Sequence, residues 1–270
     1  MAKMTNLYDA TKCTACRGCS VACKNWNQNP AWIEPFKGSY QTHEDNNYCT
    51  YTMIKFNEED GVFQPNWYFS KFQCMHCTDP ACMKVCPRKA ISQTKWGAVV
   101  KDYDRCVGCQ YCSSACPFGV PKYDPNISKV TKCTLCSERV EGADEGFNRP
   151  ACAKTCPTGA LTFGDRDELL SQARERVKWL RANGSPNATI YGEHELGGLN
   201  KIYILGDTPD HYGLPVQPKV SATVPVWKDW VQPYVGYLIP LALAGSAVSF
   251  FTTRFLANKQ HASENHGEEA

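Results

Sequence analysis

The chain has 270 residues, carries a formal net charge of +2 and contains 17 cysteines. A chain of this length can build one or two domains with their own hydrophobic cores, so disulfide scaffolding is the weaker explanation for so many cysteines. The near-neutral charge excludes a broad basic surface for nucleic acid, and a hydrophobic content of 43% excludes intrinsic disorder for most of the chain.

Sixteen of the cysteines fall into four groups of four. The groups are, in chain order, Cys13, Cys16, Cys19 and Cys23; Cys74, Cys77, Cys82 and Cys86; Cys106, Cys109, Cys112 and Cys116; Cys133, Cys136, Cys152 and Cys156. The last three groups each end in a Cys-Pro pair. Cys49 is left over, in an alternating stretch that predicts a β-hairpin of residues 48–56 and 61–72, and we expect it to be a small buried thiol.

The spacing indicates which cofactor these thiols bind. A CxxCxxC run places three sulfurs on one [4Fe-4S] cluster, and a fourth cysteine followed by proline ligates the second cluster of bacterial two-cluster ferredoxins. A zinc ribbon has no place for a third cysteine two residues after a CxxC pair. The third group matches the ferredoxin spacing up to Pro117, whereas the fourth group alone would also suit zinc. We therefore predict four [4Fe-4S] clusters.

The second and third groups flank a strand predicted at residues 98–103, which is the layout of a compact two-cluster ferredoxin. We expect each of these two groups to supply its fourth cysteine to the cluster of the other group. By elimination, the first and fourth groups are then paired in the same way. The expected ligand sets are site A (Cys13, Cys16, Cys19, Cys156), site B (Cys133, Cys136, Cys152, Cys23), site C (Cys74, Cys77, Cys82, Cys116) and site D (Cys106, Cys109, Cys112, Cys86). A tandem pairing of group one with two, and three with four, stays open.

No group lacks a cysteine, so no iron is left open to a substrate, and we predict a one-electron relay without catalytic residues. His76 is interpreted as a spacer between two ligands. Four oxidised clusters of net charge −2 each would bring the loaded protein to about −6. Basic residues near the cysteines are candidates to offset this charge: Lys12, Arg17, Lys24, Lys84, Arg88, Lys89, Arg105 and Lys132.

The cysteines stop after Pro157. The sequence then predicts a strand at residues 160–163, a helix capped by Asp165 that runs to about Arg181, and strands near 188–191 and 201–205. The helix has one apolar face, made of Leu169, Leu170, Ala173, Val177 and Leu180. A Pro-rich passage at residues 207–225 is expected to lie along a neighbour or a surface.

Residues 230–253 carry no formal charge. A helix of this length reaches roughly 36 Å and can cross a hydrocarbon layer of about 30 Å, whereas a buried core helix would usually be shorter. An aromatic cluster marks its start (Trp227, Trp230, Tyr234, Tyr237), and small residues in its second half favour packing against another membrane helix. The flanking charges do not decide the orientation, since Lys219 and Lys228 precede the span and Arg254 and Lys259 follow it.

These motifs together resemble a known family. The four cysteine groups, the segments 132–136, 139–140, 150–152 and 154–160, and one C-terminal membrane helix resemble the iron–sulfur subunit of respiratory molybdopterin oxidoreductases. Segments 191–192, 196–199, 202–205, 212–215 and 227–228 resemble more narrowly the beta subunit of membrane-bound formate dehydrogenase. In nitrate reductase relatives a tryptophan replaces one cysteine of the third group, so Cys109 counts against that branch.

The resemblance implies that a separate catalytic subunit with a molybdenum or tungsten pterin oxidises formate. This chain would pass the electrons to a membrane cytochrome b and on to quinone, and the pairing of group one with group four is favoured. The family often works outside the bacterial cytoplasmic membrane, so we expect the cluster domain on the extracytoplasmic side. Because residues 1–10 do not read as a signal peptide, export would depend on a partner's signal, and a cytoplasm-facing complex stays open.

The expected fold is α+β, with two ferredoxin-like two-cluster subdomains and one C-terminal transmembrane helix. Residues 1–164 would form the four-cluster region, 165–229 a segment contacting partners, 230–256 the membrane helix and 257–270 a polar tail. Two other functions remain as alternatives: the same relay serving another molybdopterin reductase or a hydrogenase, and a zinc-binding, membrane-anchored structural protein.

Overall fold

The structure, a computed structural model, describes residues 3–38, 40, 43–61, 66–142, 148–221, 226 and 230–265. Trp227 of the expected aromatic cluster and Lys228 of the flanking charges lie outside the described residues. The chain divides into two compact units, Met1–Ser221 and Ala222–Ala270. Each unit is described by itself below.

A four-stranded sheet holds the first unit together. It contains β1 (Met4–Asp9), β8 (Leu161–Asp165), β9 (Thr189–Tyr191) and β10 (Lys201–Leu205), in the order β8-β1-β10-β9. β1 runs parallel to β10, and the other neighbours are antiparallel. The strands predicted near 160–163, 188–191 and 201–205 are confirmed, but the sequence did not predict β1. This strand connects the first residues of the chain to residues about 195 positions later, as the pair Asn6 and Lys201 illustrates.

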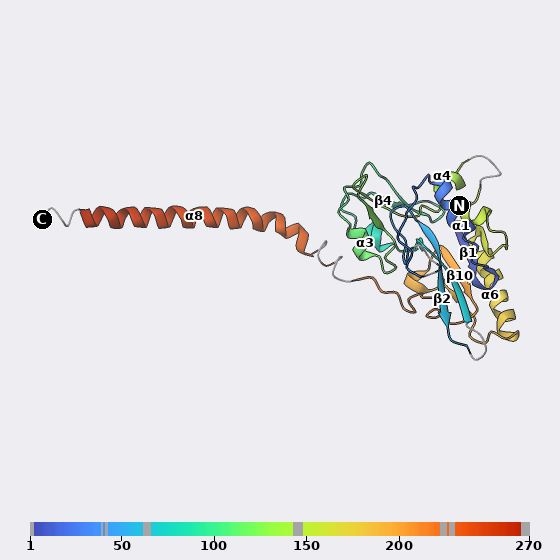
Figure 1. The fold of residues 1–270 in the computed structure, drawn as a ribbon. Helices are drawn as coiled ribbons and strands as arrows, with labels where there is room; N and C mark the ends of the chain where they lie inside the picture. The colour runs from blue at the N-terminus through green and yellow to red at the C-terminus, as the bar shows by residue number, and fades with distance from the viewer. Residues whose placement is uncertain are drawn as a thin grey trace. The chain divides into compact units, whose positions relative to one another are not determined.

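Helix α6 (Arg166–Ala182) covers one face of this sheet (Figure 1). The Asp165 side chain accepts hydrogen bonds from the backbone N–H groups of Asp167 and Glu168, so the predicted N-cap is confirmed. The predicted apolar face is confirmed as well, because all five of its residues are buried against Leu7, Ile202 and Ile204. Burial of this face accounts for the position of the helix on the sheet.

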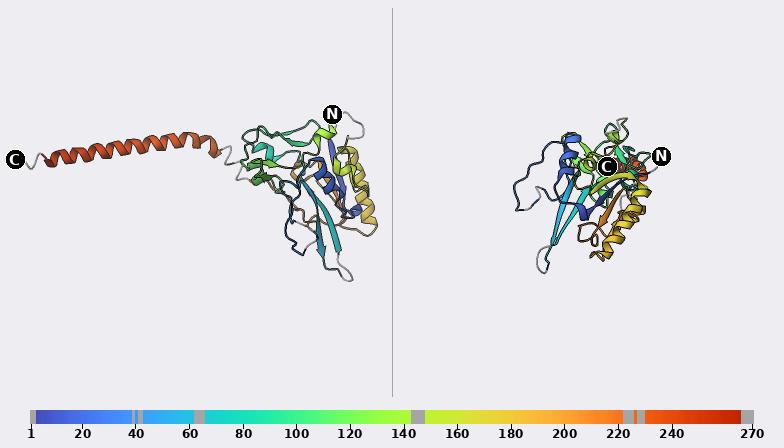
Figure 2. Two further views of the ribbon diagram at one scale, coloured as in Figure 1. Left: turned by 45° about the horizontal axis from the view of Figure 1, so that its top comes forward. Right: turned by 90° about the vertical axis from the view of Figure 1, so that its right-hand side faces the viewer.

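The predicted hairpin is formed by β2 (Thr52–Glu59) and β3 (Asn66–Gln73), which Figure 2 shows projecting from the rest of the unit. The turn expected at residues 57–61 was wrong in position. Asn57 pairs with Tyr68, and pairing continues to Glu59 and Asn66, so three of the expected turn residues belong to β2. Cys49 precedes the hairpin and is 1% exposed, which confirms a buried thiol.

The cysteine-rich remainder consists of short elements. The helices are α1 (Gly18–Trp26), α2 (Ala81–Lys84), α3 (Tyr111–Ala115), α4 (Ser137–Val140) and α5 (Ala151–Lys154), with 3-10 turns η1 (Ala10–Lys12) and η3 (Glu195–Gly197). Two small hairpins, β4 (Ile91–Gln93) with β5 (Val99–Lys101) and β6 (Lys122–Asp124) with β7 (Lys129–Thr131), complete it. The strand predicted at residues 98–103 is therefore present. α1 packs on α5 and α2 packs on α3, which brings group one to group four and group two to group three.

The Pro-rich passage contains no helix or strand over residues 207–221. It is anchored on the core of the first unit rather than merely lying on its surface. Tyr212 and Leu214 are buried with Tyr203 and Leu205, and the Tyr212 hydroxyl accepts a hydrogen bond of 3.0 Å from the N–H of Gly206. The passage thus adds two side chains to the same core that contains the cysteines.

The second unit is dominated by α8 (Gln232–Asn265), whose stretch Pro233–Leu256 has a mean hydropathy of 1.6 and is not covered by other residues. This helix is long and apolar enough to cross a membrane. Its hydroxyls bond to its own backbone: those of Ser246, Thr252 and Thr253 donate to carbonyls three or four residues earlier, at 2.8–3.0 Å. The polar atoms of these side chains are therefore satisfied without water.

Candidate functional site

Three cavities in the first unit are each lined by four thiols. The empty space in each, including the part open to solvent, is about 320, 320 and 340 Å³. The thiols that line them are, respectively, Cys13, Cys16, Cys19 and Cys156; Cys23, Cys133, Cys136 and Cys152; Cys86, Cys106, Cys109 and Cys112. Each cavity therefore combines three cysteines of one group with a single cysteine of another.

The remaining four thiols of the groups lie close to one another. Burial raises the pKa of Cys77, and the charges of Cys74, Cys116 and Cys82 raise it further. Within the described residues, no three His, Cys, Asp or Glu side chains converge in the way that would hold a single metal ion. The thiols surround cavities instead of meeting at a point.

The same backbone turn precedes the second cysteine of every group. Ala15, His76, Gly108 and Leu135 each occupy this position, and all four have a positive φ, between 46° and 71°. In the first and fourth groups this left-handed residue turns its N–H group toward the first sulfur of the loop. The N–H groups of Ala15 and Leu135 lie 3.4 and 3.3 Å from the sulfurs of Cys13 and Cys133. Such N–H···S bonds stabilise negative charge on the sulfur.

The Cys-Pro pairs start a second repeated turn. Lys89, Gly119 and Gly159 stand three residues after the cysteine of each pair and have φ values of 50°, 62° and 65°. In the first of these turns the N–H of Ala90 lies 3.3 Å from the Cys86 sulfur. Group one departs from this pattern, because Cys23 has no following proline and lies inside α1.

Burial makes several of these sulfurs poor sites for an isolated thiolate. It raises the pKa of Cys133 to about 11 and that of Cys136 to about 12. A deprotonated sulfur at such a position requires a positive partner, which iron in a cluster supplies, so soft thiols around a closed cavity fit a [4Fe-4S] cluster. Cys16 and Cys109 differ, since both are exposed.

Three lysines are enclosed in the same core. Lys71 and Lys201 are 0% exposed and Lys132 is 2% exposed. The sequence singled out only Lys132. Lys71 is three residues before Cys74 but no local motif marks it as buried, and Lys201 is distant from every cysteine along the chain. Two of the other predicted offsetting cations are on the surface, Lys12 beside Asp9 and Lys84 beside Asp79.

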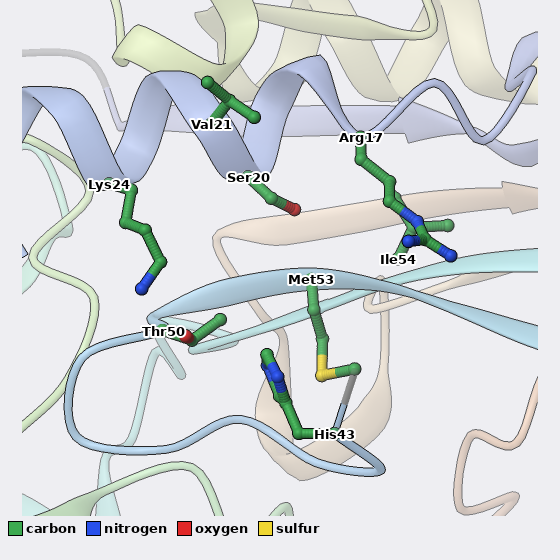
Figure 3. Close-up of a pocket in the computed structure, with 8 residues that line it drawn as sticks. All are labelled: Arg17, Ser20, Val21, Lys24, His43, Thr50, Met53 and Ile54. Carbon is green, nitrogen blue, oxygen red and sulfur yellow. The ribbon is translucent and has the colours of Figure 1, made fainter. Parts of the chain in front are cut away.

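A further cavity, of about 570 Å³, lies between α1 and β2 and contains no thiol. Figure 3 shows Ser20 and Lys24 of α1 on one side, with Met53 of β2 and His43 opposite. Lys24 is already engaged, because its ammonium group donates to the carbonyls of Pro30 and Cys49 at 2.6 and 3.1 Å. Both ring nitrogens of His43 are buried without a hydrogen-bond partner, and burial lowers the pKa of this residue.

Comparison with known proteins agrees with this chemistry. Residues 65–166 match the family model of a 4Fe-4S dicluster domain. The nitrate-inducible formate dehydrogenase iron–sulfur subunit of Escherichia coli is 38% identical over 253 residues, 92% of this chain and 82% of that one. Formate dehydrogenase 2 subunit beta (cytochrome c-553) of Nitratidesulfovibrio vulgaris is 36% identical over 217 residues, 76% of this chain and 94% of that one. The hydrogenase-2 operon protein HybA of E. coli O157:H7 is 34% identical, over 90% of this chain and 82% of that one.

Gly108 provides a test of the loop geometry. A Cβ atom there would lie 2.4 Å from the carbonyl oxygen of Ser128, whereas one at Gly119, also at positive φ, would meet nothing within 4 Å. We expect Gly108→Ala to displace the Cys106–Cys109 loop and lower the iron bound per chain, while Gly119→Ala binds the wild-type amount. Iron analysis of both purified variants measures this, and equal iron in the two would contradict the steric argument.

Proposed function

Because this chain belongs to the family of iron–sulfur subunits of formate dehydrogenase, we propose that it relays single electrons through four [4Fe-4S] clusters. The electrons would come from a catalytic subunit with a molybdenum or tungsten pterin that oxidises formate. They would leave to a membrane cytochrome b and then to quinone. The observation that carries the proposal is the placement of twelve thiols around three cavities, four to each.

The proposed ligands are those of sites A, B, C and D as defined from the sequence. The three thiol-lined cavities have the composition of sites A, B and D, and the charges that act on Cys77 come from the other members of site C. Sites C and D would then form one ferredoxin-like two-cluster unit, and sites A and B the other. Cys49 takes no part, since it lines none of these three cavities.

The sites would lie in a row from A to D. Burial is the largest cause of the raised pKa of three thiols, and each also interacts with a thiol of the next site: Cys19 with Cys152, Cys133 with Cys74, and Cys82 with Cys112. The two exposed thiols, Cys16 and Cys109, belong to sites A and D. The ends of the row would thus be the places where electrons enter and leave, while the middle is shielded from water.

The second unit would anchor the subunit. We propose that residues 230–256 cross the bacterial cytoplasmic membrane beside the cytochrome partner and that residues 257–270 form a polar tail. The apolar stretch Pro233–Leu256 supports this. The cluster-bearing region, residues 1–164, and the segment 165–229 would lie on the extracytoplasmic side, against the partner subunits.

A second candidate function is the same relay in the service of a hydrogenase, which the likeness to HybA favours. The two functions differ in the electron donor and not in this chain's own chemistry. Purification of the native complex through a tag on this chain distinguishes them. Formate-dependent reduction of a viologen dye supports the first function, and hydrogen-dependent reduction supports the second.

Metal analysis tests the proposed cofactors. We expect about sixteen irons and an equal amount of acid-labile sulfide per chain, because each of four clusters contains four of both. The measurement is made on the full chain purified without oxygen. Zinc in place of iron, with no sulfide, would refute the relay and support a structural zinc protein.

Removal of one thiol tests the exchange between groups. We expect Cys23→Ala to lose the cluster of site B, so iron falls by about four per chain and Cys133 and Cys136 become open to alkylation. Cys13 and Cys16 should stay protected, which peptide mass spectrometry after iodoacetamide treatment measures. Cys49→Ala is the matched control and should retain all iron. Loss of protection from alkylation at Cys13, with Cys133 still protected, would contradict this ligand assignment.

Truncation tests the anchor. A chain ending at Ser221 retains the whole first unit and lacks α8. We expect the full chain to stay with membranes after alkaline carbonate extraction, whereas the truncated chain is recovered in the soluble fraction with its iron. Membrane retention of the truncated chain after the same extraction would show that α8 is not the anchor.

A further inference from the structure

Lys71 and Lys132, two of the three lysines buried in the cysteine-rich core, have only neutral hydrogen-bond partners. The ammonium group of Lys71, on β3, donates to side-chain oxygens of Thr52 and Gln73. That of Lys132 donates to the backbone carbonyls of Val99 and Cys133, the latter at 2.9 Å. Across the described part of the chain, no carboxylate lies within ion-pair distance of either group.

A buried ammonium group with neutral partners is costly, because carbonyl and hydroxyl oxygens replace only part of its hydration. Negative charge must therefore lie close by in the assembled protein. Burial acts to lower the pKa of Lys71, but the charges of Cys152, Cys19 and Cys23 outweigh it and the pKa is raised. Thr52 and Gln73, which accept from Lys71, both line the cavity of site B, so the cysteine sulfurs around that cavity are the anionic groups next to Lys71.

Lys132 also lies next to cysteines of two proposed sites, in this case sites B and C. Cys133, whose carbonyl accepts from Lys132, lines the cavity of site B. Val99, whose carbonyl also accepts from Lys132, donates its N–H to Nδ1 of His76 at 2.9 Å, inside the Cys74–Cys77 loop of site C. In terms of the proposed ligand sets, Lys71 faces thiols of sites A and B, and Lys132 faces thiols of sites B and C. Each lysine lies beside two neighbouring sites.

We propose that Lys71 and Lys132 are internal counter-charges of the electron relay, Lys71 for the clusters of sites A and B and Lys132 for those of sites B and C. They are positioning residues, since neither is a ligand, and the inference rests on the proposed function. A fixed positive charge stabilises the reduced state of a neighbouring cluster, because reduction adds an electron. In a dry interior this attraction is stronger than at the surface.

Lys201 is buried as well but has a different role. Its ammonium group donates to the Asn6 side-chain oxygen at 2.7 Å, across the parallel pair β1 and β10. The ammonium group also lies 5.3 and 5.2 Å from the ring centroids of Tyr8 and Tyr203. Burial and the neighbouring Lys71 lower the pKa of Lys201 and outweigh the charges of nearby cysteines, which act to raise it. We therefore assign the counter-charge to Lys71 and Lys132 and a structural contact to Lys201.

The lysine that lines the cavity of site D is less buried than Lys71 and Lys132. Lys101 is only half-buried, donates to the carbonyl of Val130 and lies 4.3 Å from the ring of Tyr103. Water and salt screen a charge in this position. The two buried lysines thus serve sites A to C from positions where water does not screen their charge.

The test is a potentiometric titration of the full, cluster-loaded chain followed by EPR. For Lys132→Gln we expect the oxidised-to-reduced ratio at a fixed potential to rise at least tenfold for two of the four clusters, which is about 59 mV for a one-electron couple. Lys71→Gln should shift an overlapping pair, with the cluster of site B common to both. The Cys23→Ala variant identifies the site B signal.

Lys84→Gln is the matched control. Lys84 is two residues from both Cys82 and Cys86, but its side chain is 59% exposed and paired with Asp79. This variant removes the same charge near the same ligands along the chain, and we expect all four potentials to stay at their wild-type values. A shift in potential as large as that of Lys132→Gln would contradict the argument that a lysine must be buried to affect the clusters.

Lys71→Arg and Lys132→Arg retain the charge and should keep the wild-type potentials. If a glutamine variant fails to load iron while its arginine counterpart loads, the charge itself is required, which supports the proposal. Unchanged potentials in the loaded glutamine variants, or failure of both variants at a position to load, would overturn it. Absence of iron and sulfide from the wild-type chain would instead refute the proposed function, so the two failures are distinguishable.

Discussion

The rest of the structure depends on one constraint, the burial of negatively charged sulfur. A thiolate in a dry interior is unstable unless positive charge or hydrogen-bond donors surround it. The backbone meets this need with a left-handed residue before the second cysteine of each group, such as Leu135, whose N–H group turns toward the Cys133 sulfur. The four loops therefore share one geometry although their side chains differ.

The same constraint connects distant parts of the chain. Cys23, inside α1, lines a cavity with Cys133 and Cys152, and Cys156 lines another with the first cysteines of the chain. The packing of α1 on α5 makes this exchange possible, and the parallel pairing of β1 with β10 joins the chain's start to its later strands. The cysteine-rich loops and the sheet are consequently one compact unit rather than a row of independent modules.

The thiols differ in how deeply they are buried, and this difference suits an electron relay. Cys16 and Cys109 are exposed, whereas Cys133, Cys136 and Cys152 are buried. Exchange with a partner requires accessible ends, while transfer between inner sites benefits from a dry surrounding that changes little with each electron. Because that surrounding cannot hydrate charge, cations such as Lys71 must lie inside it.

The sequence by itself determined the features that depend on local spacing. Cysteine intervals indicated the cofactor, a 3.6-residue apolar period placed the buried face of α6, and an uncharged stretch marked the helix Pro233–Leu256. Only the tertiary structure decided where β1 pairs, where the β2–β3 turn begins and which lysines enter the core. Those outcomes depend on contacts between residues far apart in the chain, such as Asn6 with Lys201, and no local pattern encodes them.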